Sequence, residues 1–172
     1  MTRGVLLFCF DTKHTKYHMI LEKCVHLLKK NLKLEITVVT DYQTFKKIKP
    51  LGFINYKFIE PELGNSKNAQ EWNNKDRHMA YELSPYDTPL VMDIDYCCYT
   101  DNLLQLMDTG YDFLIPDQVH DLTQRNSFHQ RVWSMIPMVW ATVFVFRKTA
   151  KAKQIFDMIK YVKQHIRNKK IN

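Results

Sequence analysis

Two aspartates separated by one residue follow a short apolar run in the segment Thr88-Pro-Leu-Val-Met-Asp-Ile-Asp-Tyr96. Within a strand, residues i and i+2 point to the same side, so Asp93 and Asp95 would face one site. Paired carboxylates are suitable ligands for a Mg²⁺ or Mn²⁺ ion that carries a diphosphate. The spacing alone is not specific, because twelve aspartates in 172 residues give about one such pair by chance. Two solvated carboxylates in a turn after a strand are the alternative interpretation.

The position of the other aspartates favours a ligand site. Three expected strands each run into an aspartate: residues 5–10 into Asp11, residues 34–39 into Asp41, and residues 90–92 into Asp93. Ligands of open α/β sheets bind beyond the carboxyl ends of the strands, and parallel strands bring those ends to the same edge. We therefore expect these acidic side chains to line one edge of a sheet.

The order of apolar patterns predicts an α/β fold, with a Rossmann-like and mostly parallel sheet flanked by helices. Strands are expected at residues 5–10, 34–39, 56–59, 90–92, 112–115 and 142–146, and helices at 14–30, 73–83, 100–107 and 152–166. Residues 62–74 form a polar segment, and residues 117–140 show no clean period. We expect both to be loops, and the second to cover a bound ligand or contact a second substrate.

Composition narrows the class of protein. A chain of 172 residues with 45% hydrophobic residues suits one globular domain. No apolar run approaches the roughly 18 residues of a membrane span, and residues 5–10 are too short for the core of a signal peptide. The four cysteines lack zinc-site spacing, so we expect buried, inert thiols and a cytoplasmic location.

The net charge of +7 is concentrated at the two ends of the chain. Residues 1–50 contain ten lysines and arginines, and residues 148–172 contain eight, whereas residues 51–147 carry more acids than bases. Such ends could attract an anionic ligand to a site that holds a cation. Solvated helix faces explain the same lysines, and so does a noncatalytic module that binds nucleotides or nucleic acid.

Four segments together resemble the GT-A fold of nucleotide-sugar glycosyltransferases, in particular the glycogenin-like and phage-encoded members. They are Trp72-Asn-Asn-Lys-Asp-Arg77, Ala80-Tyr-Glu-Leu-Ser-Pro-Tyr-Asp87, Leu90-Val-Met-Asp-Ile-Asp95 and Trp140-Ala-Thr-Val-Phe-Val-Phe-Arg147. A basic residue on a helix about sixteen positions before the Asp-x-Asp pair is typical of that family. The resemblance implies one GT-A-like domain over residues 1–172, Mn²⁺ or Mg²⁺ as cofactor, and a UDP-sugar as donor. The location would be the host cytoplasm if the protein is viral.

The resemblance also implies roles for individual residues. Asp93 would contact the donor ribose and help to hold the metal, Asp95 would bind the metal, and Arg77 would reach the diphosphate or the sugar. These three are the expected catalytic residues. The remaining contacts to the nucleotide-sugar would come from Asp11, Thr12, His14, Asp41, Ile94, Ala141 and Thr142.

Several alternatives stay open. Arg77 could instead pair with Glu82 or Asp87, and Asp41 could be a helix cap. Glycogenin-like enzymes carry a third metal ligand, usually histidine, in a downstream segment that has no obvious equivalent before Asn172. Either diphosphate and water complete the metal shell, or the domain is trimmed and holds the donor-binding part without the acceptor part. A nucleotidyltransferase is a further reading, and the acceptor of a transferase could be nucleic acid or a glycan.

Overall fold

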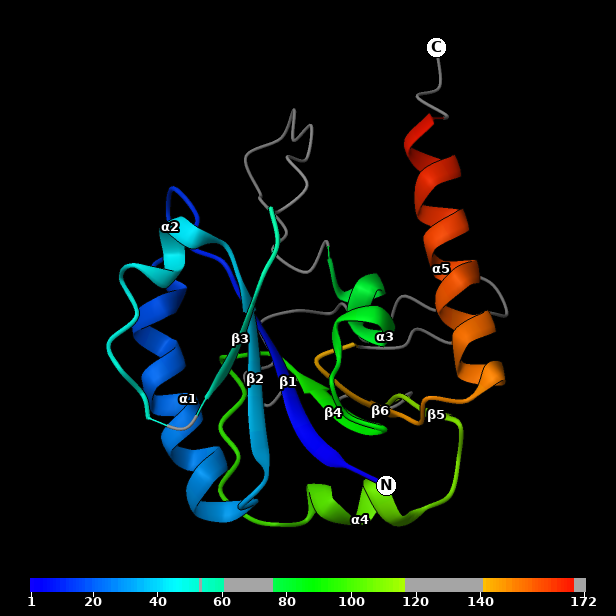
Figure 1. Ribbon diagram of the computed structural model, residues 1–172, viewed down its shortest axis with the longest axis horizontal. Coiled ribbons are helices and arrows are strands. Elements are labelled where there is room, and N and C mark those ends of the chain that lie inside the picture. Colours follow the sequence, from blue (N-terminus) through cyan, green and yellow to red (C-terminus); the bar gives the residue numbers. More distant parts are fainter. Residues whose placement is uncertain (53, 61–75, 117–140, 169–172) are drawn as a thin grey trace, which may run out of the picture.

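The protein is built around one sheet of mostly parallel strands with helices on both faces, as Figure 1 shows. The computed structural model describes residues 1–52, 54–60, 76–116 and 141–168. The sheet has six strands in the order β3-β2-β1-β4-β6-β5. The expected α/β, Rossmann-like fold class is therefore confirmed.

The parallel part of the sheet is formed by the first four strands. These are β1 (Arg3–Cys9), β2 (Glu35–Thr40), β3 (Asn55–Phe58) and β4 (Thr88–Met92). The strand β6 (Val143–Phe146) runs antiparallel to β4 and to β5 (Phe113–Leu114). Because β1 lies between β2 and β4, the chain segments that follow these three strands meet at the same edge.

Alternate side chains of the central strand enter two separate cores, which makes three layers. Val5, Leu7 and Cys9 of β1 pack on one face, and Leu6 and Phe8 pack on the other. A strand that is covered on both faces needs a continuous apolar sequence rather than an alternating one. Burial of each large side chain contributes about 1.5–3 kcal/mol, so the central strands form a rigid base for the loops at their ends.

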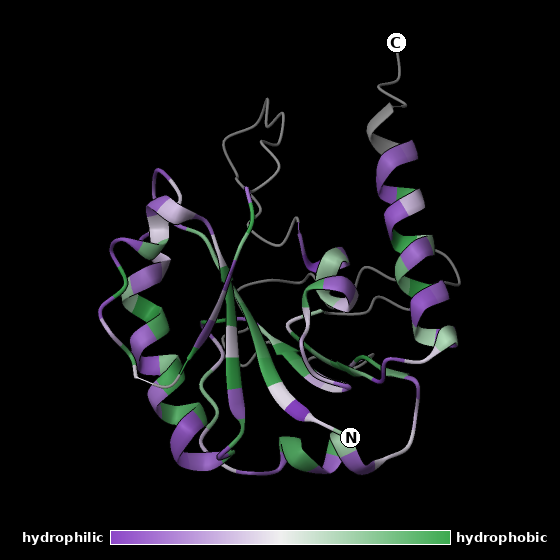
Figure 2. Cartoon of the chain, viewed as in Figure 1, coloured by the Kyte–Doolittle hydropathy of each residue, from purple (hydrophilic) through white to green (hydrophobic). Residues whose placement is uncertain are grey.

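Each face of the sheet is covered by its own helices. The helices α1 (Tyr17–Asn31) and α4 (Leu103–Asp108) cover the first face. The second face carries the 3₁₀-helix η1 (Arg77–Met79), α3 (Ala80–Leu83) and α5 (Ala150–Asn168). Figure 2 shows hydrophobic residues concentrated in the strands, whereas the long helices carry both hydrophobic and hydrophilic residues. The short helix α2 (Tyr42–Phe45) follows β2.

The structure differs from the expected elements at particular places. Helix α1 begins at Tyr17 rather than at residue 14, because Thr12 Oγ1 accepts hydrogen bonds from the backbone N–H groups of residues 14 and 15 and holds them in a turn. On α5, Ala152 and Phe156 are buried, whereas Ile155 and Val162 of the expected apolar face are 36% and 45% exposed. The helix therefore packs through a narrower stripe than its sequence pattern predicts.

Some expectations fall outside the described residues. They include the polar segment 62–74, the loop 117–140 and residues 73–75 at the start of the expected helix 73–83. Within the described ranges, no helix is both long and apolar enough to cross a bilayer. The cysteines of the described ranges are all free thiols, but Cys97 is exposed, which corrects the expectation that every cysteine is buried.

Candidate active site at the carboxyl edge of the sheet

The aspartate pair lies in a turn directly after β4. Strand β4 ends at Met92, so the two aspartates do not share a strand face, and the strand argument for their orientation is wrong. Within the turn, Ile94 is buried in the core, whereas Asp95 is exposed and the Asp93 side chain is 21% exposed. The turn is fixed by two backbone hydrogen bonds, from Asp93 N to Thr142 O at 2.8 Å and from Tyr96 N to Asp93 O at 3.2 Å.

Arg77 is the buried cation of this site. Its side chain comes from η1, is only 8% exposed, and forms an ion pair between Nη2 and Asp93 Oδ1. Its Nη1 donates a hydrogen bond to the carbonyl oxygen of Ala141. Burial lowers the pKa of Arg77 to about 10, while the charge of Asp95 acts to raise it. The guanidinium therefore stays charged at neutral pH and is shared between the turn after β4 and the segment before β6.

This arrangement joins four of the expected site residues. Arg77, Asp93, Ala141 and Thr142 are linked by direct contacts, and Asp95 lies close enough for its charge to act on Arg77. The alternative partners Glu82 and Asp87 are not the ones that Arg77 contacts. Asp87 instead accepts a hydrogen bond from Thr2 N at 2.7 Å.

The donor set at this turn fits a hard divalent cation. Two carboxylates are what Mg²⁺ commonly takes from a protein when substrate phosphates and water fill the other positions. In the described ranges, no group of three His, Cys, Asp or Glu side chains is placed to hold a metal ion. A cation at Asp93 and Asp95 would therefore depend on a phosphate ligand to complete its shell.

A second group of expected residues lies at the ends of β1 and β2. The Asp11 carboxylate is 8% exposed and accepts hydrogen bonds from His18 N at 3.0 Å and from the His18 ring at 2.7 Å. Lys47 Nζ lies 3.0 Å from the same carboxylate. Burial acts to raise the pKa of Asp11, but the hydrogen bonds from His18 and Lys47 outweigh it and hold that pKa below its usual value. Asp11 is therefore an ionised group that also anchors the start of α1.

Thr44 connects this group to Asp41. The Thr44 hydroxyl accepts a hydrogen bond from Asp11 N at 2.9 Å and donates one to Asp41 Oδ2 at 2.9 Å. Asp41 also accepts from Thr44 N at 2.7 Å, which is the geometry of a helix N-cap. Asp41 thus caps α2 with both carboxylate oxygens, as the alternative interpretation of its position held. Its contact with a nucleotide stays a prediction.

The loop after β1 presents the other two expected residues. Thr12 is half-buried and its hydroxyl is used inside the loop, whereas His14 is exposed. The sequence did not predict His18 or Thr44 as site residues, and Lys47 was expected only among the basic residues of a nucleic-acid-binding module. A polar residue three positions after Asp41 is the usual spacing of a capping contact, so the pattern Asp41-x-x-Thr44 could have predicted the α2 cap.

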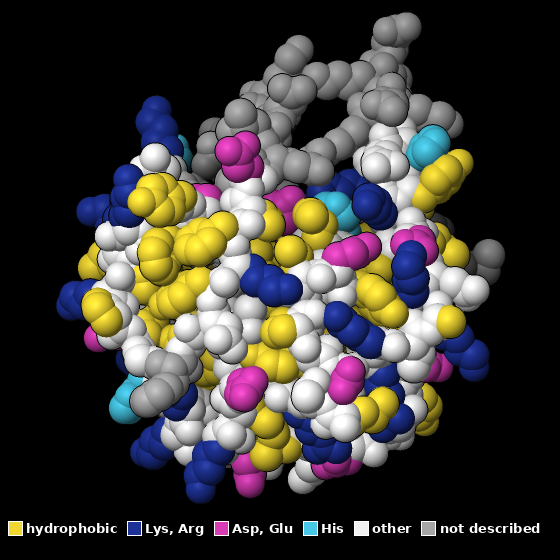
Figure 3. Space-filling model, in the orientation of Figure 1, with side chains coloured by type: hydrophobic (Ala, Val, Ile, Leu, Met, Phe, Trp, Pro, Cys, Tyr) yellow, Lys and Arg dark blue, Asp and Glu magenta, His cyan; other side chains and the backbone are white. Residues whose placement is uncertain are grey.

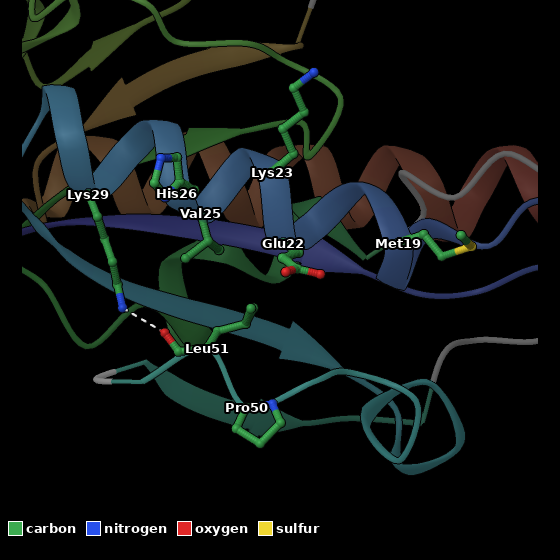
Figure 4. Close-up of a pocket in the computed structure, with 8 residues that line it drawn as sticks. All are labelled: Met19, Glu22, Lys23, Val25, His26, Lys29, Pro50 and Leu51. Atoms are coloured by element: carbon green, nitrogen blue, oxygen red, sulfur yellow. Dashed lines mark hydrogen bonds between the residues drawn. The ribbon is translucent and has the colours of Figure 1, made fainter.

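A separate hollow lies away from this edge. A cavity of about 480 Å³ lies between α1 and the segment before β3, where Lys29 Nζ donates a hydrogen bond to Leu51 O at 2.8 Å. Figure 4 shows the residues that line it. Its lining, which includes Glu22 and His26, mixes charges of both signs and contains none of the expected site residues. The turn after β4, rather than this hollow, is therefore the candidate site.

Comparisons with known proteins bear on the fold. The sequence matches no family model and no curated protein. Among solved structures, the chain is similar to galactosyltransferase LgtC in complex with donor and acceptor sugar analogs, with a TM-score of 0.63 and 17% identity. The match covers 94% of this chain and 64% of that one. The fold is shared with GT-A glycosyltransferases.

Other neighbours extend the likeness. The glycosyltransferase GlyE of Streptococcus pneumoniae TIGR4 gives a TM-score of 0.55 at 14% identity, over 96% of this chain and 39% of that one. The 4-diphosphocytidyl-2C-methyl-D-erythritol synthase of Anaerococcus prevotii gives 0.51 at 13% identity, over 94% of this chain and 76% of that one. At these identities the likeness to the solved structures shows the fold alone.

Proposed function

We propose that the protein is a metal-dependent glycosyltransferase that takes a sugar from a nucleoside diphosphate sugar, with a UDP-sugar as the expected donor. The observation that carries the proposal is the contact of Arg77 with both Asp93 and the Ala141 carbonyl at the carboxyl edge of the sheet. This edge is where open α/β sheets bind ligands, and the chain shares its fold with glycosyltransferases.

In this proposal the turn after β4 holds the diphosphate. Asp93 and Asp95 would bind Mn²⁺ or Mg²⁺, which supplies a Lewis acid that neutralises charge on the leaving diphosphate. Arg77 would bind the same phosphates, because its delocalised fork of donors suits oxygen-rich anions. Arg77 neutralises Asp93 when no ligand is bound. If a cation and a diphosphate bound together, the cation would pair with the Asp93 carboxylate and the phosphates would pair with Arg77, so no buried charge would be left unpaired.

The group at the ends of β1 and β2 would receive the nucleoside. Asp11 is held ionised by His18 and Lys47, so it would act mainly by positioning the loop that carries Thr12 and His14. The exposed ring of His14 is available to stack on a base. The backbone at Ala141 and Thr142 would approach the donor sugar, since both carbonyls already face the Arg77–Asp93 pair.

A nucleotidyltransferase is the second candidate, because enzymes of that class are also among the structural neighbours. Such enzymes likewise need a metal-bound phosphate. Against this reading, Asp11-Thr-Lys-His14 stands after β1 where a Gly-rich phosphate loop would be expected. Both candidates bind a nucleotide, so the products must separate them.

A thermal-shift panel of nucleoside diphosphates and their sugars, each with and without Mn²⁺, tests the proposal. A ligand at about a hundred times its Kd stabilises the folded state by about 2.7 kcal/mol, which raises the midpoint visibly. We expect a Mn²⁺-dependent shift with UDP or a UDP-sugar. Release of UDP from the sugar would favour the glycosyltransferase, and release of pyrophosphate from UTP would favour the nucleotidyltransferase. No shift with any nucleotide would contradict both.

A further inference from the structure

An aromatic surface lies on α2 and β3, at the edge of the sheet away from β4. Its rings are those of Tyr42, Phe45, Tyr56 and Phe58, and we call it the α2–β3 aromatic surface. Phe45 packs edge-to-face against both Tyr56 and Phe58 with ring centroids 5.0 Å apart, and Tyr42 lies 6.4 Å from Phe58. Tyr42 and Phe58 are 60% and 53% exposed, so two aromatic side chains that rest on a packed aromatic base are largely accessible to solvent.

Positive charge surrounds these rings. Lys46 Nζ sits 4.4 Å from the centroid of the Tyr42 ring. Figure 3 shows the hydrophobic side chains over α2 and β3 bordered by lysine and arginine side chains along that side of the molecule. The exposed lysines on α2, on the segment after it and in the neighbouring loop after β1 are Lys13, Lys16, Lys46, Lys47 and Lys49.

The nearby acids are largely neutralised. Asp11 is paired with Lys47, and the Asp41 carboxylate is used to cap α2. Glu22 lies 3.9 Å from Lys49, and Glu60, just beyond β3, is exposed. The surface therefore presents flat rings within a zone of net positive charge.

We propose that the α2–β3 aromatic surface binds single-stranded nucleic acid, with bases stacked on Tyr42 and Phe58 and phosphates held by the lysines. Aromatic platforms combined with a basic groove are how proteins bind single strands, and the bases of a duplex are already stacked and cannot reach such rings. A neutral glycan would stack on the rings but would gain nothing from the lysines. The surface is separated from the Arg77–Asp93 pair by β1 and β2, so this proposal does not rest on the proposed transferase function.

Fluorescence anisotropy with a labelled oligothymidylate of about 20 nucleotides, longer than one typical site, is the direct test. We expect the wild-type protein to bind at low salt, and Tyr42→Ala and Phe58→Ala each to weaken binding about fivefold or more. Lys46→Gln should reduce the slope of log affinity against log salt by about 0.7, the value for one lost phosphate contact on a single strand. As controls, Tyr111→Ala (Tyr111 is 65% exposed, in the segment before β5) and Lys30→Gln should leave affinity and slope unchanged.

Two outcomes would overturn the proposal. One is the absence of oligonucleotide binding by the wild-type protein at low salt. The other is equal competition by inorganic polyphosphate together with wild-type affinity in both ring variants, which would mean a polyanion surface that does not use the rings. In case a ring variant folds poorly, wild-type protein is photo-crosslinked to a 4-thiouridine strand. Crosslinks in peptides containing Tyr42 or Phe58 would support the proposal, and crosslinks confined to other peptides would contradict it.

Discussion

The buried ion pair between Arg77 and Asp93 makes a quantitative prediction about stability. Replacing Arg77 by methionine keeps much of its volume but leaves the Asp93 carboxylate facing no cation, and also frees the Ala141 carbonyl. Loss of one partner of a buried pair costs about 3–5 kcal/mol. The Asp93 side chain is 21% exposed and retains some contact with water, so we expect a smaller loss of about 2–3 kcal/mol for Arg77→Met.

The double variant should lose less than the two single variants combined. Asp93→Asn leaves a buried guanidinium that still has Ala141 and the charge of Asp95, so we expect a loss of about 2 kcal/mol. When both partners are replaced, no charge is left unpaired, and an apolar side chain of similar volume is tolerated. Arg77→Met/Asp93→Asn should therefore resemble one single variant, with a coupling free energy of about 2 kcal/mol.

Urea unfolding of the four proteins measures this coupling. The exposed pair of Lys153 and Asp157 on α5, with Nζ 2.7 Å from Oδ2, is a matched control that should show no measurable coupling. If the losses in free energy of unfolding of Arg77→Met and Asp93→Asn add to that of the double variant within about 0.5 kcal/mol, the predicted coupling between the two side chains is wrong.

Three further predictions concern the scaffold around the site. Asp11→Asn should lower the free energy of unfolding at neutral pH, and its difference from wild type should shrink toward about pH 3. A carboxyl whose pKa is lowered in the folded state stabilises the protein above its unfolded pKa and loses that effect as pH falls through its folded pKa. A difference between the urea midpoints that stays constant over this pH range would contradict the prediction. Gly4→Ala should lower the free energy of unfolding by about 1–3 kcal/mol, because the new methyl group would overlap the buried Tyr86 ring. Adding Tyr86→Leu to this variant should recover part of the lost stability in thermal unfolding. An unchanged thermal midpoint for Gly4→Ala would contradict the close packing of Gly4 against Tyr86. Cys97 should react first with a thiol reagent in the native protein, because it is exposed, whereas the other three cysteines are buried and burial raises the pKa of Cys9 to about 12. We expect one fast-reacting thiol in the native protein and four after unfolding. Several fast-reacting thiols in the native protein would show that the reagent reaches the core.

Continuous apolar runs made the sheet predictable. Residues 5–10 and 34–39 were predicted as buried strands from their apolar runs, and the aspartates that follow them lie at one edge of the sheet, as expected. The antiparallel direction of β6 was not predictable, because the direction of a strand is set by the route of the chain before it and not by its own residues. Helix α2 was not predicted, because four residues are too few to show a helical period in the sequence.

The sequence predicted only some of the residues that meet at the candidate site. The Asp-x-Asp spacing and a basic residue on a preceding helix indicated Asp93, Asp95 and Arg77, yet the contact between Arg77 and the Ala141 carbonyl joins residues 64 positions apart. No local pattern encodes such a contact. The contact of His18 with Asp11 spans only seven positions, but it depends on how the loop between β1 and α1 folds, whereas Lys47 lies 36 positions from Asp11.

Titration calorimetry of UDP binding to wild type and Asp95→Asn, with and without Mn²⁺, tests whether Asp95 binds a metal ion that holds the nucleotide. The exposed Asp101→Asn serves as control, because it lies six residues further along the same chain segment. We expect wild type and Asp101→Asn to bind UDP only when Mn²⁺ is present. We expect Asp95→Asn to lose this binding while keeping its thermal midpoint in the absence of ligand. Equal Mn²⁺-dependent affinity in Asp95→Asn and wild type would contradict the assignment of the metal to the turn after β4.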